Sequence, residues 1–168
     1  LYSASDISVW KTEKIEEHPF LQRIGPDILN PNLTWREVAE RLQSKAFAGR
    51  ALNSVYLDQA FLAGLGNYLR SEILFIAGVH PARKARELSK GEIGKLARAT
   101  LDISQRSYAS QGVTIPDRQY KTLKKKGISY GKARFFVFSR ANQPCRVCET
   151  KIQRSTANSR RIYTCATC

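Results

Sequence analysis

The feature that most constrains the fold of this chain is a set of four cysteines near its C-terminal end. They form two Cys-x-x-Cys pairs, Cys145 with Cys148 and Cys165 with Cys168, and sixteen residues separate the pairs. Each Cys-x-x-Cys turn directs two sulfurs at one point, and two such turns joined by a hairpin complete a tetrahedral sulfur site suited to zinc. The pattern predicts one zinc ion. Iron in a rubredoxin-like site and a pair of disulfides are the alternatives.

A site with four protein ligands has no open coordination position, so the predicted zinc is structural. Such a small module buries little apolar surface, and metal binding is expected to supply most of its folding free energy. The β-rich pattern of residues 135–138 predicts where the module begins. Arg160 and Arg161 fall near the hairpin tip, where they can enter a DNA groove. The alternative is that both are solvated charges.

The charge of the chain is unevenly distributed. The sequence has 28 Lys and Arg against 14 Asp and Glu, a net charge of +14. Residues 1–40 hold four basic and seven acidic residues, which leaves 24 basic and seven acidic residues, or +17, for residues 41–168. Such an excess of positive charge predicts a polyanionic partner, and a nucleic acid is the favoured candidate. A merely soluble basic protein is the alternative.

The sequence contains no apolar run near the ~20 residues of a membrane helix, and no signal peptide is visible. Paired cysteines of the metal-binding type therefore indicate a reducing, cytoplasmic compartment. The sequence contains no Met, so residue 1 is not expected to be a translation start. The chain is expected to be part of a longer protein.

Helix signals occupy the region before the cysteines. Two Thr/Ser-x-x-Glu capping boxes, at Thr34 with Glu37 and at Ser89 with Glu92, mark helix starts. Apolar residues then recur at helical spacing, and Gly78 and Gly112 provide stops. The first predicted helix begins at residue 34, and three further helices are predicted over residues 52–62, 68–77 and 89–110.

A sharp turn between two of these helices is the second candidate site. Gly64 and Gly66 let the backbone turn tightly and approach a partner, and Asn67 lies at the first turn of the next helix. Free backbone N–H groups and the helix dipole favour phosphate there. The alternative is that Asn67 is an ordinary helix cap without a binding role.

Residues 112–134 change in character. Three Gly, one Pro and seven basic residues stand among few apolar ones. The segment is too polar for a core and too long for a compact connector. It is expected to be a mobile basic loop.

These motifs together resemble the formamidopyrimidine-DNA glycosylase and endonuclease VIII family. The resemblance rests on residues 57–81, on the Val137-Phe-x-Arg140 and Pro144-Cys145-x-x-Cys148 stretches, and on Ser159-Arg160 before the last cysteine pair. The stretch from residue 57 to residue 70 looks more like the endonuclease VIII branch than its purine-specific relatives. The family implies a helix-two-turns-helix domain followed by a zinc finger. It also implies glycosylase and AP-lyase chemistry on oxidised bases in double-stranded DNA.

The resemblance also suggests roles for individual residues. Asn67 matches the family's asparagine that binds the backbone phosphate at an abasic site, and Arg160 matches the finger arginine that grips phosphates around the lesion. Glu72 matches a glutamate of the family. We assign it a packing or positioning role in preference to a catalytic one. Asn53 stands where some relatives carry a lysine, so no phosphate contact is assigned to it. A bacterial, cytoplasmic monomer associated with nucleoid DNA is implied.

The family's nucleophile is an N-terminal proline, which attacks the sugar C1′ as a secondary amine. A following glutamate and a hairpin lysine assist it, and all three belong to an N-terminal β-sandwich domain. Leu1 is no substitute, and only residues 1–10 resemble the last strand of that domain. No catalytic residue is therefore assigned to this chain, which is expected to be inactive alone and to bind DNA for a missing catalytic domain.

The sequence thus predicts a mainly α-helical fold with a small zinc β-hairpin finger. Residues 1–29 are expected to be a remnant of the N-terminal domain and a linker, residues 30–134 the helix-two-turns-helix domain, and residues 135–168 the finger. Two other classes of function stay open. One is a non-catalytic, zinc-containing nucleic-acid-binding module, and the other is a protein-interaction scaffold with a zinc ribbon.

Overall fold

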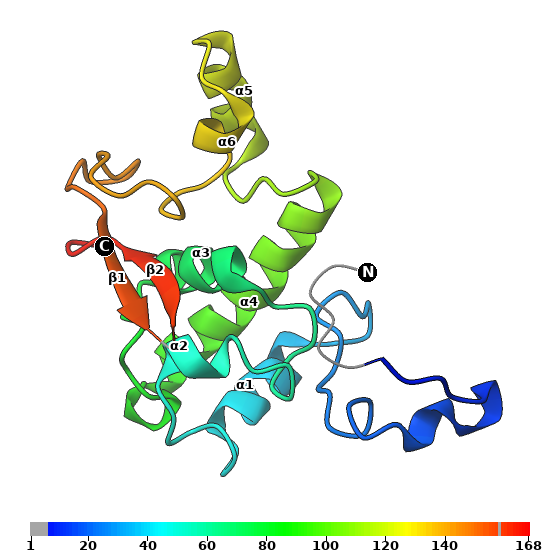
Figure 1. Ribbon diagram of the computed structural model, residues 1–168. Helices are drawn as coiled ribbons and strands as arrows, with labels where there is room; N and C mark the ends of the chain where they lie inside the picture. The colour runs from blue at the N-terminus through cyan, green and yellow to red at the C-terminus, as the bar shows by residue number, and fades with distance from the viewer. Residues whose placement is uncertain (1–6, 158) are drawn as a thin grey trace.

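The computed structural model describes residues 7–157 and 159–168, which form a helical body with a two-stranded hairpin at the C-terminal end (Figure 1). The fold class predicted from the sequence is confirmed. The elements in chain order are η1 (Thr12–Glu17), α1 (Trp35–Gln43), α2 (Leu52–Val55), α3 (Asn67–Ala77), η2 (Ala85–Glu87), α4 (Lys90–Ala109), α5 (Asp117–Lys125), α6 (Tyr130–Ala133), β1 (Gln153–Ala157) and β2 (Arg160–Thr164). None of the described helices combines the length and the apolar character needed to cross a membrane.

Both predicted capping boxes are present. The Thr34 and Ser89 hydroxyls accept the backbone N–H groups of Glu37 and Glu92, and the glutamates accept in return. These contacts satisfy N–H groups that the first turn of a helix leaves free. The helix α3 ends at Gly78, whose φ of 66° is left-handed. The starts of α1 and α4 and the end of α3 therefore lie where the sequence placed them.

The helix predicted over residues 52–62 is wrong in extent, because α2 ends at Val55. Polar side chains then bind the backbone in its place. The Asp58 carboxylate accepts the Ala60 N–H at 2.9 Å, and the Gln59 side chain bridges Gly64 N–H and Leu65 C=O at 2.9 and 3.0 Å. Such local bonds compete with the helical ladder and favour turns.

The core lies where α4 packs against both α1 and α3. It is built from fully or nearly fully buried apolar side chains, among them Val38, Leu42, Ile73 and Leu96. The hairpin contributes Ile162 to the same cluster, so the finger and the helical body share a core. A smaller cluster with Val137, Cys145 and Ile152 lies beneath the cysteines.

One further expectation is corrected, and one β-rich pattern does not form a strand. Residues 112–134 are not a mobile loop, because α5 and α6 form within them and Tyr120 and Leu123 pack against the smaller cluster. Residues 135–138 form no strand, because three of their N–H groups donate to the buried Glu72 carboxylate and none pairs with a neighbouring strand.

The remnant strand expected at residues 1–10 lies partly outside the described residues. Residues 7–10 form no strand, since a strand needs hydrogen bonds to a neighbouring strand and these residues make none. At the other end, β1 and β2 pair antiparallel, with Gln153 opposite Thr164 and Ala157 opposite Arg160. Arg160 and Arg161 therefore follow the hairpin turn directly, as predicted.

Candidate nucleic-acid interface and metal centre

The four cysteines come together at the base of the hairpin. Their Sγ atoms lie within 4.8 Å of one another, and Cys148 Sγ lies 3.4 Å from Cys165 Sγ and 3.3 Å from Cys168 Sγ. These separations exceed the about 2.05 Å of a disulfide, so the thiols are free. Four sulfurs at about 2.3 Å from a central ion would lie about 3.8 Å apart in a tetrahedron. The cluster is therefore positioned to bind one metal ion.

The surroundings of the cysteines shift the pKa values of their thiols in different directions. The Thr150 hydroxyl and backbone N–H lower the pKa of the Cys148 thiol to about 6. Burial has the opposite effect on Cys145, whose pKa is raised. The residue after Cys148, Glu149, has a left-handed φ of 64°, which closes the tight turn of the first cysteine pair.

A buried carboxylate joins the helical body to the segment that leads into the cysteines. Glu72 lies on α3 with no exposed surface, and its two oxygens accept the N–H groups of Phe136, Val137 and Phe138 at 2.8–2.9 Å. The Thr114 hydroxyl donates a fourth hydrogen bond. Burial raises the pKa of Glu72, and these hydrogen bonds act in the opposite direction. This geometry is consistent with the packing role predicted for Glu72.

The turn before α3 and the basic hairpin meet at Asn67. Its side-chain Nδ2 donates to the backbone C=O of Arg161 at 3.0 Å, across 94 residues of sequence. Asn67 is the first residue of α3, as the sequence predicts, and it lies beside the strand that carries Arg160 and Arg161. The two candidate phosphate-binding motifs are therefore one continuous surface.

The fold requires glycine at one of the two glycine positions of this turn and not at the other. Gly64 has a left-handed φ of 89°, and a Cβ there would lie 3.2 Å from Ile28 Cγ2, so the fold itself requires glycine. Gly66 is extended and caps α3, and a Cβ there would meet nothing within 4 Å. The space beside Gly66 is open for a partner.

Arg70, to which the sequence motifs assign no role, lies beneath this surface. Its guanidinium is fully buried and donates to Asn67 Oδ1 at 2.7 Å, to Arg161 C=O at 3.1 Å and to Asn53 C=O at 3.0 Å. Among the described residues no carboxylate forms an ion pair with it. Burial, with the charge of Arg160, lowers the pKa of Arg70 to about 10.

The signal for Arg70 is visible in hindsight. It interrupts an apolar helix face that includes Leu69, Ile73 and Leu74, where a charge needs a specific partner. Asn53, which stands in place of a lysine, contributes its backbone carbonyl to Arg70 and no charge.

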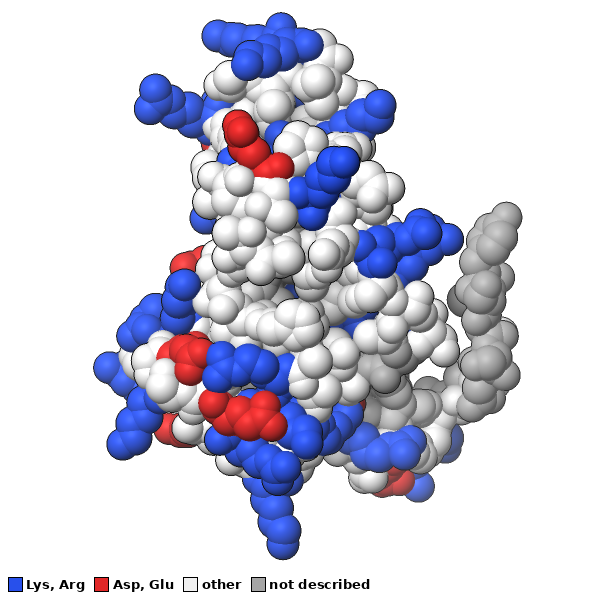
Figure 2. All heavy atoms as spheres, turned by 90° about the vertical axis from the view of Figure 1, so that its left-hand side faces the viewer, with Lys and Arg blue, Asp and Glu red and all other residues white. Residues whose placement is uncertain are grey.

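The surface is rich in unpaired basic side chains. Figure 2 shows Lys and Arg side chains over much of one face, with fewer acidic ones, and a basic group at the top of the molecule where α5 lies. Three ion pairs join described residues, Arg50 with Asp58, Arg83 with Glu92 and Lys121 with Asp117. Most of the other basic side chains are exposed and are therefore available to a polyanion.

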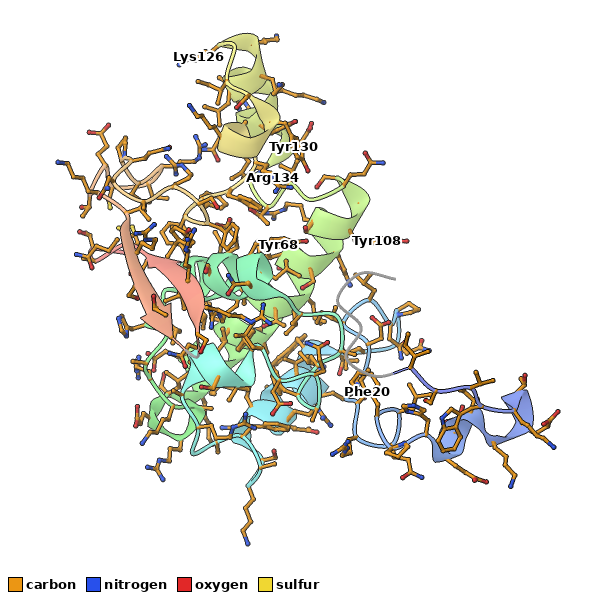
Figure 3. All side chains as sticks on the ribbon, in the orientation of Figure 1. Phe20, Tyr68, Tyr108, Lys126, Tyr130 and Arg134 are labelled. Atoms are coloured by element: carbon orange, nitrogen blue, oxygen red, sulfur yellow. The ribbon has the colours of Figure 1, made fainter. Side chains whose placement is uncertain are left out.

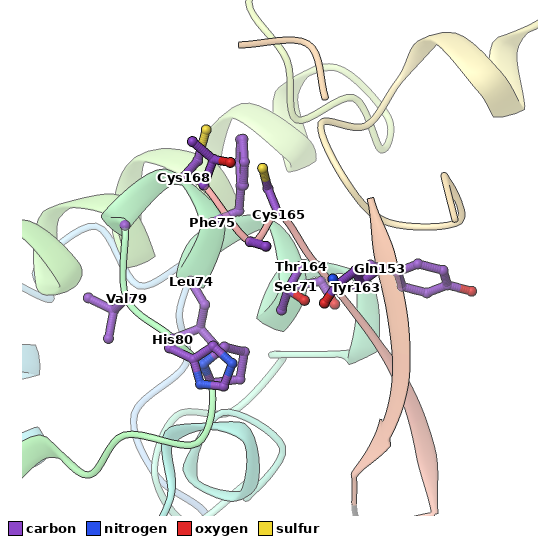
Figure 4. Close-up of a pocket in the computed structure, with 14 residues that line it drawn as sticks. Ser71, Leu74, Phe75, Val79, His80, Gln153, Tyr163, Thr164, Cys165 and Cys168 are labelled. Atoms are coloured by element: carbon purple, nitrogen blue, oxygen red, sulfur yellow. The ribbon is translucent and has the colours of Figure 1, made fainter. Parts of the chain in front are cut away.

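A cavity of about 410 Å³ lies between α3 and the hairpin (Figure 4). His80, Ser71, Gln153 and Thr164 are polar residues of its lining, and the buried Ser71 hydroxyl has no hydrogen-bond partner among the described residues. The lining includes no Asp, Glu or Lys. It therefore offers no carboxylate for acid–base chemistry, and its titratable side chains are those of His80, Tyr163, Cys165 and Cys168.

The chain is similar in sequence to a known domain family and to known proteins. The formamidopyrimidine-DNA glycosylase H2TH domain matches residues 24–119. The chain is similar to Endonuclease 8 of Shigella sonnei (strain Ss046), at 45% identity over 168 residues, which are 100% of this chain and 60% of that protein. The same identity and coverage hold for Endonuclease 8 of Escherichia coli (strain HS). The chain thus spans less than two thirds of these relatives.

Solved structures share the fold. The MutM (Fpg) protein of Thermus thermophilus matches with a TM-score of 0.74 and 28% identity, over 95% of this chain and 58% of that chain. Lactococcus lactis Fpg in complex with abasic-site DNA matches with a TM-score of 0.71 and 21% identity, over 94% of this chain and 55% of that chain. Because the H2TH domain covers more than half of its residues, the chain belongs to the formamidopyrimidine-DNA glycosylase H2TH family.

Proposed function

We propose that this chain is the DNA-binding part of a base-excision-repair DNA glycosylase and AP lyase. The parent enzyme acts on oxidised bases, with a preference for oxidised pyrimidines. The observation that carries the proposal is the hydrogen bond from Asn67 to the Arg161 carbonyl, which fuses the turn and the basic hairpin into one surface. The identity to Endonuclease 8 along the whole chain supports the reaction class. The partner is double-stranded DNA with oxidised bases or abasic sites, bound by a cytoplasmic monomer.

The surface suits a DNA backbone with a distorted segment. Asn67 and the open backbone beside Gly66 present N–H groups at a helix start, where phosphate is favoured. Arg160 and Arg161 are exposed on the adjoining strand and provide charge-assisted contacts to further phosphates. The buried charge of Arg70 adds a positive potential beneath them.

The metal of the cysteine centre is proposed to be a single zinc ion with a structural role. Four sulfur ligands are typical of structural zinc and leave no position for water or substrate. Cys145, Cys148, Cys165 and Cys168 would hold it, and its binding would fix the hairpin on the body. Base excision is assigned to residues outside these 168.

Binding to a duplex with an abasic-site analogue tests the interface. Asn67→Ala and Arg160→Ala should each weaken binding by about 1–3 kcal/mol, the range for lost charge-assisted or buried hydrogen bonds. Arg154→Ala is the matched control, because it removes an exposed arginine from the paired strand β1. Equal losses for all three variants in fluorescence anisotropy would mean that only net charge matters.

Two measurements test whether this chain binds DNA without performing the chemistry. In a salt series with ~5 phosphate contacts, the logarithm of the binding constant should fall with the logarithm of the salt concentration at a slope of about −4 to −5. Borohydride trapping is the second measurement. The same 168 residues should trap no lesion-selective covalent complex with abasic DNA. Efficient selective trapping would place the nucleophile within this chain and contradict the assignment.

A further inference from the structure

The segment that folds into α5 and α6 concentrates more positive charge than any role within the fold requires. Residues 117–134, here called the basic arm, hold seven basic residues and one acid, Asp117, a net charge of +6. Asp117 already pairs with Lys121 at 2.6 Å. Among the described residues no carboxylate pairs with the other six cations, Arg118, Lys124, Lys125, Lys126, Lys132 and Arg134.

The basic arm is held in a defined position. The Tyr130 hydroxyl donates to Gln111 C=O at 2.6 Å, and the Arg134 guanidinium lies over the Tyr130 and Phe135 rings at 4.7 and 4.3 Å. The Arg134 carbonyl accepts the Thr114 N–H at 2.9 Å. Figure 3 shows Arg134 at the end of the arm near α4 and Lys126 at its outer end.

The finger holds the arm from the other side. Arg146, which lies between the first two cysteines, donates to the carbonyls of Lys132 and Phe135 at 2.8 and 2.9 Å. The arm is therefore ordered before any partner arrives. A partner that binds it does not have to supply the free energy of ordering it.

The lysines lie on the outer side of α5. Tyr120 and Leu123 pack inward, while Lys121, Lys124 and Lys125, at helical spacings of three and four, are exposed. A nine-residue helix is about 13 Å long, which spans about four base pairs of duplex DNA at 3.4 Å each. Over this length the exposed ammonium groups can reach backbone phosphates.

The basic arm is separate from the interface at Asn67. In Figure 1, α5 and α6 lie at one end of the molecule, and the turn between β1 and β2 lies toward the other, near α2. We propose that the basic arm is a second phosphate-binding surface, which grips the duplex outside the segment held by Asn67 and Arg160. This inference rests on the proposed function, because it takes duplex DNA as the partner.

The test compares two triple variants that change the charge equally. Lys124→Gln/Lys125→Gln/Lys126→Gln alters the arm, and Lys14→Gln/Lys45→Gln/Lys90→Gln removes three exposed lysines elsewhere. Each is titrated with a duplex of about 25 base pairs and one of about 8, both with a central abasic analogue, across a salt series. Circular dichroism establishes that both variants are folded.

On the long duplex the arm variant should lose about tenfold or more in affinity, and its salt slope should shrink by about 2–3, one per lost phosphate contact. The control variant should lose no more than about threefold, and on the short duplex the two variants should agree. Equal behaviour on the long duplex overturns the proposal. So does a loss of the same size on both duplexes, which would place the arm within the footprint of Asn67 and Arg160.

The two proposals fail differently. If Asn67→Ala weakens binding while the arm variant matches its control, the proposed function stands and the arm is a solvated surface. If the unaltered chain shows no salt-dependent binding to either duplex, both proposals are wrong.

Discussion

Removal of the Glu72 carboxylate gives the sharpest test of how the finger is attached to the helical body. Glu72→Ala would leave three backbone N–H groups, at residues 136–138, and the Thr114 hydroxyl without their acceptor. A buried donor without a partner costs about 1–3 kcal/mol, so four give a loss of about 4 kcal/mol or more. That is a large part of the roughly 5–15 kcal/mol that stabilises a typical domain.

Urea denaturation followed by circular dichroism measures this loss as a change in the free energy of unfolding. Glu72→Gln keeps one acceptor oxygen and turns the other into a donor that faces N–H groups, so we expect an intermediate loss of about 2–3 kcal/mol. This second variant provides the measurement if Glu72→Ala does not fold. Glu40→Ala is the control, since Glu40 is exposed on α1 and surface changes cost within about 0.5 kcal/mol. A Glu72→Ala loss below about 1 kcal/mol would refute the reasoning.

Three further predictions address the interface, the metal and a helix start. Arg70→Met leaves three acceptors without the donors that Arg70 provides, so the free energy of unfolding should fall by about 1–3 kcal/mol. DNA affinity of the folded variant, measured by anisotropy, should fall about tenfold, because Asn67 loses the donor that orients it; an unchanged affinity would contradict this. Metal analysis should give about one zinc per chain, and chelation or Cys148→Ser should unfold the finger and abolish tight DNA binding while the helices persist; full affinity without metal would rule out the structural role. Hydrogen bonds from Arg83 and the Ser89 backbone lower the pKa of Glu92 from 4.5 to about 2. Because the folded-state pKa is depressed, this stabilisation is present above pH 4.5 and is lost as the pH falls toward 2, so Glu92→Gln should flatten the stability–pH curve in that window; an unchanged acid limb would show that the contact contributes nothing.

Local signals in the sequence were enough for the elements whose geometry depends on near neighbours. The capping boxes at Thr34 and Ser89 set helix starts because hydroxyl and carboxylate groups three residues apart satisfy free N–H groups. The Cys-x-x-Cys spacing similarly set the metal centre, since each turn brings its own two sulfurs together. Local spacing also gives the positions of the turn at residues 64–67 and of the hairpin arginines, while their phosphate contacts stay a prediction.

Tertiary contacts decided what those signals could not. Residues 135–138 have a β-rich pattern, but Glu72 on a distant helix takes their N–H groups, and no local pattern reports an acceptor more than 60 residues away. The segment at 112–134 looked too polar to be ordered, yet the smaller core cluster, Arg146 and Gln111 hold it in place. Arg70 is the clearest case. Its sequence position indicates a helix, but only the approach of the hairpin makes it a buried cation that orients Asn67.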